Sequence, residues 1–176
     1  MTAARGPRVV LIGPMGAGKT TVAGLLSQAW GCEVRDTDHD VEAQEGRSVQ
    51  EIFVELGEPY FRDRERAAVR AAVREHPGVL ALGGGAVMDP GTREVLEGQR
   101  VVFLNVGLAD AAKRVGLGQG RPLLVGNVRS RIKAILTERA PIYTAVASHV
   151  VDTDGRTPED VADEVRRWVE EQEPEQ

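Results

Sequence analysis

The stretch Gly13-Pro14-Met15-Gly16-Ala17-Gly18-Lys19-Thr20 decides the fold of this chain. It matches G-x-x-x-x-G-K-[ST], the pattern of a phosphate-binding loop. Residues 8–12 (RVVLI) form an apolar run before it, which predicts a buried strand, and residues 21–30 carry apolar side chains at helical spacing. This order of strand, loop and helix predicts backbone amides and a helix N-terminus that bind phosphate together.

Two side chains of this loop have a predicted chemical role. In such a loop the lysine reaches the β- and γ-phosphates and the hydroxyl ligates Mg²⁺, so we expect these roles for Lys19 and Thr20. Lysine is rare in the chain, with only Lys113 and Lys133 besides Lys19, so its presence here is not background usage. The alternative is a chance glycine-rich turn, which the flanking strand and helix disfavour.

Composition restricts the classes of protein that the chain can belong to. Its 176 residues suit one domain, and its 27 acidic against 22 basic residues, a net charge of −5, argue against a general nucleic-acid binder. Cys32 is the only cysteine, so no disulfide framework exists and a reducing compartment is expected. No run approaches the ~20 apolar residues of a membrane span. We therefore expect a cytoplasmic protein without membrane or nucleic-acid partners, and a monomer.

Two aspartates follow the second predicted strand, at residues 33–36. Residues two apart on a strand face the same way, so Asp36 and Asp38 are expected to project together at the carboxyl edge of the sheet, where ligands bind. Two carboxylates beside a phosphate loop can serve a metal and accept a proton. The alternative is an Asx-rich turn that caps the next helix.

The remaining pattern alternates strands with helices. Further strands are predicted at 78–82, 100–105 and 149–152. The expected helices cover residues 39–45, 48–57, 58–76, 90–97, 108–115, 128–139 and 158–171. Short apolar strands between helices predict an α/β fold of three layers, α/β/α, with a five-stranded parallel sheet covered on both faces. We expect a single domain over 1–176, with excursions at about 37–65 and 115–127.

Glycines mark two further sites. Gly83-Gly84-Gly85 ends a strand, which indicates that something approaches the backbone closely, although a plain flexible turn is the alternative. The run 116–122 is also rich in glycine, and Arg121 is its only charge. A flexible loop with one arginine can close over a nucleotide, so we expect a mobile lid there, with a disordered linker as the alternative.

At this point the chain closely resembles the shikimate kinase family. The matching segments occur in the order and at about the spacing of that family, from about residue 8 to 158. They are GPMGAGKT at 13–20, DTD at 36–38, Phe61-Arg62 with Glu65, LGGGAV at 82–87, RPLL at 121–124 and RAPIY at 139–143. The run at 61–65 would by itself indicate a solvated charged helix face, and the resemblance replaces that interpretation.

The resemblance implies a fold like that of nucleoside monophosphate kinases, with sheet order 2-3-1-4-5. It implies MgATP-dependent phosphorylation of the 3-hydroxyl of shikimate. Arg62 and Arg139 would hold the carboxylate of shikimate, because planar guanidinium groups suit it, and Glu65 would orient Arg62. Asp38 would accept a hydrogen bond from the attacking hydroxyl. The implied substrate-binding residues are Asp38, Phe53, Phe61, Arg62, Glu65, Gly83, Gly84, Gly85 and Arg139.

The resemblance also implies a nucleotide site for ATP and Mg²⁺. Asp36 would hold Mg²⁺ through water together with Thr20, and Arg121 would join Lys19 in neutralising the transferred phosphoryl group, so that Lys19, Asp38 and Arg121 form the catalytic set. Arg114 and Pro158 would enclose the adenine. The implied ATP-binding residues are Gly13, Pro14, Met15, Gly16, Ala17, Gly18, Lys19, Thr20, Thr21, Arg114, Arg121, Arg156 and Pro158.

Two other functions remain open at this stage. One is a kinase of the same fold with another small acceptor, such as gluconate or a nucleoside monophosphate. A nucleotide acceptor would need a base pocket and more arginines, whereas gluconate also carries a carboxylate. The other is a regulatory protein that binds a nucleotide without an acceptor, which the predicted acceptor arginines and lid disfavour.

Overall fold

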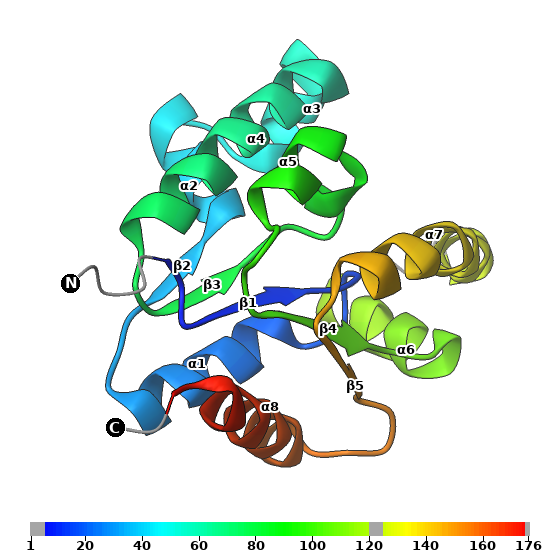
Figure 1. Ribbon diagram of the computed structural model, residues 1–176. Helices are drawn as coiled ribbons and strands as arrows, with labels where there is room; N and C mark the ends of the chain where they lie inside the picture. The colour runs from blue at the N-terminus through cyan, green and yellow to red at the C-terminus, as the bar shows by residue number, and fades with distance from the viewer. Residues whose placement is uncertain (1–5, 120–124, 175–176) are drawn as a thin grey trace.

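The computed structural model describes residues 6–119 and 125–174 (Figure 1). Its elements, in chain order, are β1 (Val9–Ile12), α1 (Lys19–Trp30), β2 (Val34–Asp36), α2 (Thr37–Glu45), α3 (Val49–Leu56), α4 (Glu58–Glu75), β3 (Val79–Ala81), the 3-10 turn η1 (Ala86–Met88), α5 (Pro90–Val95), β4 (Val101–Asn105), α6 (Leu108–Gln119), α7 (Val125–Val146), β5 (His149–Asp152) and α8 (Pro158–Gln172).

The five strands form one parallel sheet in the order β2-β3-β1-β4-β5, which confirms the predicted fold. Strand β1 is in the middle, with Val9 opposite Val79 of β3 and Val10 opposite Val101 of β4. All four residues of β1 are buried, as expected of a strand covered on both faces. The loop after β1 therefore leaves the sheet at the centre of its carboxyl edge.

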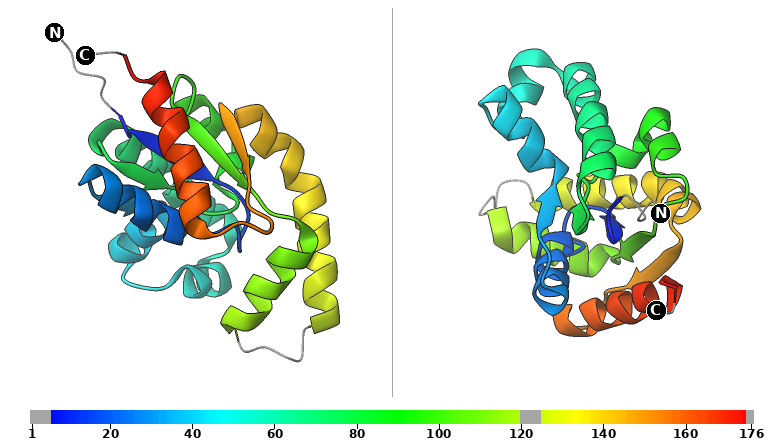
Figure 2. Two further views of the ribbon diagram at one scale, coloured as in Figure 1. Left: turned by 90° about the horizontal axis from the view of Figure 1, so that it is seen from below. Right: turned by 60° about the vertical axis from the view of Figure 1, so that its left-hand side comes forward.

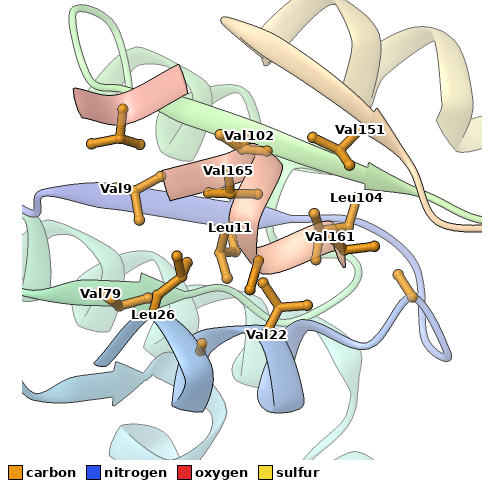
Figure 3. Packing of buried hydrophobic residues seen from close by; sticks show 14 of the residues in the cluster. Val9, Leu11, Val22, Leu26, Val79, Val102, Leu104, Val151, Val161 and Val165 are labelled. Atoms are coloured by element: carbon orange, nitrogen blue, oxygen red, sulfur yellow. The ribbon is translucent and has the colours of Figure 1, made fainter. Parts of the chain in front are cut away.

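Helices cover both faces of the sheet (Figure 1). Val9 and Leu11 face a cluster built with α1 and α8, as Figure 3 shows around Leu26, Val161 and Val165. The alternate residues Val10 and Ile12 face a second cluster, to which α4 and α7 contribute. Alternate residues of β1 therefore contribute to two separate hydrophobic clusters, one on each face of the sheet.

A third, smaller cluster joins the helices that follow β2. Val41 of α2, Ile52 of α3, and Phe61 and Ala68 of α4 are its buried members. In Figure 2, α2 and α3 lie beyond the edge of the sheet, while α4 returns to cover it. Helix α4 therefore carries side chains of both the small cluster and the main core. Within the described residues, no helix has the length and apolar character of a membrane span.

The structure corrects the prediction for the segment after β2. Helix α2 begins at Thr37 rather than at residue 39, so Asp38 lies in its first turn and not on the strand. Asp36 is the N-cap, and its Oδ1 accepts hydrogen bonds from the backbone N–H groups of Asp38, at 2.8 Å, and His39, at 3.4 Å. The prediction that strand alternation aligns Asp36 and Asp38 is wrong, because helix capping prevails over continued strand structure.

The structure also lengthens the two helices beside the predicted lid. Helix α6 continues to Gln119 instead of ending at 115, and α7 runs from Val125 to Val146 instead of from 128 to 139. A glycine inside a helix costs only about 1 kcal/mol, and α6 packs against α7. Pro141 costs about 3 kcal/mol in a helix interior, and the burial of Tyr143 against the sheet offsets it. Residues 115–119 and 125–127 of the predicted lid are therefore helical.

We expect the cluster beneath α1 to carry much of the stability. Leu26→Ala should lower the free energy of unfolding by about 2–5 kcal/mol, since Leu26 is 1% exposed and its loss leaves a cavity. Leu56→Ala is the matched control, because this helical leucine is 43% exposed and should cost far less. Urea unfolding measures both, and equal losses would contradict this account of the core.

Candidate active site

The phosphate loop follows the central strand and begins under tight steric constraint. A Cβ atom on Gly13 would lie 2.6 Å from the carbonyl oxygen of Leu104 on β4, and the φ angle of Gly13 is +146°. Only glycine fits there. The loop ends at Gly18, the N-cap of α1, so the amino end of this helix points at the loop's interior. Its free N–H groups favour an anion at that place.

Lys19 reaches back over its own loop. Its Nζ donates to the carbonyl oxygens of Gly13, at 2.6 Å, and Pro14, at 3.0 Å. Burial lowers the pKa of Lys19 to about 8, while the negative charges of Asp38 and Asp36 oppose that shift. The ammonium group is thus poorly solvated and gains when a phosphate group binds.

Asp36 and Asp38 line one cavity with Lys19 and Thr20. This cavity has a volume of about 320 Å³. Its other lining residues are Met15, Gly16, Gly18, Leu82, Gly83 and Gly84. Burial raises the pKa of Asp38, chiefly by desolvation and also through the charge of Asp36, while Lys19 lowers it. The carboxylate of Asp38 is therefore a stronger proton acceptor than an exposed one.

Gly83 lies where two carboxylates converge. A Cβ atom on it would be 2.6 Å from Asp38 Oδ1 and 3.0 Å from Glu65 Oε2. The backbone N–H of Gly83 donates to Thr37 Oγ1 at 3.3 Å, which ties the end of β3 to the start of α2. The sequence pattern anticipates a close backbone approach here, and the approaching groups include side chains of α2 and α4.

Arg62 is held by a buried carboxylate and two phenyl rings. Its Nη1 donates to Glu65 Oε1 at 2.7 Å, and Glu65 is 1% exposed. The guanidinium carbon lies 5.3 Å from the ring centre of Phe61 and 5.8 Å from that of Phe53. A Cβ atom on Gly85 would meet Arg62 Nη2 at 2.5 Å, so the cation packs directly on the glycine segment. The rings and Glu65 fix its plane and position.

The two carboxylate oxygens of Glu65 differ in their hydrogen bonding. Burial raises its pKa and the charge of Arg62 lowers it, with the burial effect the larger. Its Oε2 is buried without a hydrogen-bond partner in the described part of the chain, and it is the atom that approaches Gly83. This oxygen can therefore accept a hydrogen bond from a hydroxyl group that enters the site.

Arg139 enters the same region from the opposite side. It lies on α7, and its Nη1 would be 3.8 Å from a Cβ atom on Gly84. Its positive charge contributes to the lowered pKa of Lys19. Two guanidinium groups, Arg62 and Arg139, thus reach adjacent glycines from separate helices, an arrangement that suits a small carboxylate.

A second cavity opens on the other side of the phosphate loop. Its volume is about 280 Å³, and it is lined by Ala17, Gly18, Thr21, Val22, Arg114, Thr153, Arg156, Pro158 and Val161. Arg114 Nη1 donates to the carbonyl oxygen of Gly16 at 2.7 Å, so this arginine is anchored to the loop. Two cations and a proline ring around an apolar floor provide surfaces for a planar base.

The sequence patterns missed two polar residues, one that lines this cavity and one that contacts its lining. Thr153 lines it and donates from Oγ1 to the carbonyl oxygen of Asn105 at 2.9 Å. Glu164 lies behind it and accepts from Arg156 Nη1 at 2.8 Å, which orients that guanidinium group. The position of Thr153 directly after β5, at the carboxyl edge of the sheet, could have indicated the first. Glu164 carries no such signal. The predicted site residue Arg121 lies outside the described residues.

Thr20 and Asp36 fit the requirements of Mg²⁺. Thr20 is exposed in the cavity and offers a hydroxyl, and Asp36 uses Oδ1 for helix capping, so Oδ2 is the oxygen that could accept from a metal-bound water. No group of three His, Cys, Asp or Glu side chains is arranged for a metal in the described ranges. Two oxygen ligands, completed by water and phosphate, are typical of Mg²⁺ sites.

Comparison with known proteins agrees with this geometry. The family model described as "Shikimate kinase" matches residues 15–170. The shikimate kinase of Salinispora arenicola is 55% identical over 159 residues, which is 90% of this chain and 95% of the relative, and that of Streptomyces avermitilis is 52% identical over 159 residues, 90% and 93% of the two chains.

A solved structure agrees with the sequence comparisons. The chain aligns with "Shikimate kinase from Acinetobacter baumannii in complex with shikimate" at a TM-score of 0.87 and 32% identity, with 97% of this chain and 96% of that chain covered. The match extends over the sheet, the phosphate loop and the helices that carry the arginines. On these grounds the chain belongs to the shikimate kinase family.

Proposed function

We propose that this protein transfers the terminal phosphoryl group of ATP to the 3-hydroxyl of shikimate. The observation that carries the proposal is the meeting of Arg62 and Arg139 at the segment Gly83–Gly85, beside the cavity that Lys19 lines. That arrangement offers a carboxylate site next to a phosphate site. Shikimate is a small ring with one carboxylate and several hydroxyl groups, so it matches both the charge and the scale of this region.

The acceptor is held by charge and aligned by hydrogen bonds. Arg62 and Arg139 bind its carboxylate, and Phe53 and Phe61 cover the apolar side of its ring. Asp38 accepts a hydrogen bond from the attacking hydroxyl and takes its proton as the acceptor oxygen bonds to the γ-phosphorus. The bond from that phosphorus to the bridging oxygen of ATP breaks in the same step, and ADP leaves. Its raised pKa favours that acceptance. Phosphoryl transfer needs little covalent help, so placing this hydroxyl in line with the phosphorus supplies much of the rate.

The nucleotide occupies the loop and the second cavity. Its phosphates accept from the loop amides and from Lys19, and its adenine lies between Arg114 and Pro158, with Arg156 alongside. Thr20 and Asp36 hold Mg²⁺, Asp36 through water, and this ion supplies neutralisation of phosphate charge. We include Arg121 as a further cation for the transferred group, which stays a prediction from the sequence.

The same proposal includes the two excursions from the core and the setting of the enzyme. The segment of about 37–65 is the substrate-binding excursion, because Asp38, Phe53 and Arg62 all belong to it. We assign the segment of about 115–127 as the lid of the nucleotide site, a prediction from the sequence whose residues 120–124 lie outside the described residues. The protein acts as a cytoplasmic monomer.

The decisive experiment compares acceptors. ADP release should rise with shikimate and stay near background with gluconate, AMP or CMP, and chelation of Mg²⁺ should abolish it reversibly. Turnover with gluconate alone would favour a different acid, since gluconate also carries a carboxylate. Slow ATP hydrolysis that no acceptor stimulates would favour a nucleotide-binding regulator instead.

We expect Asp38→Asn to separate binding from chemistry. Loss of the proton acceptor should lower kcat by about 10²–10⁴-fold. Nucleotide affinity should stay the same or tighten, because a negative charge beside the phosphates has been removed. Calorimetric titration with ADP and steady-state assays measure the two quantities. Near-normal kcat would exclude Asp38 as the orienting carboxylate.

We expect Arg139→Ala to weaken the binding of the acceptor rather than the binding of the nucleotide. A lost charge-assisted hydrogen bond of about 1.5–3 kcal/mol should raise the KM for shikimate at least tenfold. The KM for ATP should change by less than about threefold, because the adenine cavity is lined by other residues. Arg131→Ala is the matched control, an exposed arginine of the same helix. An unchanged KM for shikimate would remove Arg139 from the pocket.

A further inference from the structure

Tyr143 is a buried polar residue to which the proposed reaction assigns no task. It lies on α7, one turn after Arg139, and is 1% exposed. Its ring packs 4.9 Å from that of Phe103 on β4. The apolar contacts account for the ring, because a buried aromatic side chain contributes strongly to a core. They do not account for the hydroxyl group, which a phenylalanine would lack.

The hydroxyl group of Tyr143 donates a hydrogen bond to the carbonyl oxygen of Gly84. Gly84 lines the cavity that contains Lys19 and Asp38. A Cβ atom on Gly84 would lie 3.6 Å from the backbone nitrogen of Met15 and 3.8 Å from Arg139 Nη1. Gly84 is thus the point where the phosphate loop, Arg139 and Tyr143 meet.

This hydrogen bond fixes the orientation of a whole peptide group, not only of the carbonyl that accepts it. The C=O and N–H of a trans peptide point in opposite directions, so fixing the carbonyl of Gly84 also fixes the N–H of Gly85. Gly85 is the residue on which the Arg62 guanidinium packs. One hydroxyl on α7 therefore sets a peptide plane that lies between the two carboxylate-binding arginines.

The surroundings keep this hydroxyl group a donor. Burial raises the pKa of Tyr143, and the charge and hydrogen bonding of Arg139, together with the charge of Arg62, oppose the shift without reversing it. The phenol therefore stays protonated at neutral pH, and its proton is available to the carbonyl oxygen of Gly84.

We propose that Tyr143 is a positioning residue for the acceptor, which holds the Gly84–Gly85 peptide in place between Arg62 and Arg139. This inference rests on the proposed function, since the peptide and the arginines form the shikimate site there. Tyr143 is not among the lining residues of either cavity. It acts through the geometry of the glycine segment, so its loss should affect acceptor binding far more than nucleotide binding.

Tyr143→Phe tests the inference by removing one oxygen atom while leaving the ring to pack on Phe103. We expect the KM for shikimate and its dissociation constant by calorimetry to rise about tenfold, because the half-buried carbonyl of Gly84 loses its donor. The KM for ATP and kcat should change by less than twofold. Thr144→Val is the matched control, since its hydroxyl is exposed and donates at 2.8 Å to Ala140 within the same helix.

The outcomes separate the inference from the function. If the wild type phosphorylates shikimate and Tyr143→Phe binds it as tightly as Thr144→Val does, Tyr143 has no positioning role. If Tyr143→Phe weakens ATP and shikimate equally, with a matching loss in melting temperature, the hydroxyl is merely structural and the inference is wrong. If the wild type releases no ADP with shikimate, the proposed function fails and the inference fails with it.

Discussion

A poorly hydrated cation above the central strand is the constraint on which the rest of the site depends. Burial opposes the charged form of Lys19, the carboxylates of Asp38 and Asp36 favour it, and its Nζ donates to two loop carbonyls. Burial alone would favour its neutral form. An anion bound in the loop would therefore stabilise the ammonium group of Lys19. An apolar residue at this position would remove that interaction.

The acceptor side uses a different device, the absence of side chains. Gly83 admits the carboxylates of Asp38 and Glu65, and Gly85 admits the guanidinium group of Arg62. Arg62 and Glu65 then hold each other by a hydrogen bond, and two phenyl rings pack beside Arg62. Such groups lose little conformational freedom when a ligand binds, because folding has already restricted their side-chain conformations. Helix α4 carries Arg62 and Glu65 and packs into both the small helical cluster and the main core. It therefore connects the acceptor site to both.

Sequence patterns succeeded where a local rule governs and failed where two rules compete. The buried strand, the loop and the first helix obey one rule each, and the structure shows all three. After β2, a cap on Asp36 competes with strand alternation, and capping prevails. At residues 116–119 and 125–141, glycine and proline predict breaks, but packing between α6 and α7 and the burial of Tyr143 sustain both helices.

The sequence by itself determined the parallel α/β class, the phosphate loop and the residue types of the site, because periodicity and glycine spacing are local properties of a chain. Only the tertiary structure decided that Arg62 and Arg139, 77 positions apart in number, meet at one glycine segment, and that Tyr143 and Glu164 hold groups of the two cavities. Those contacts depend on strand order and helix packing, since side chains from distant elements come together only when a common core fixes the elements that carry them.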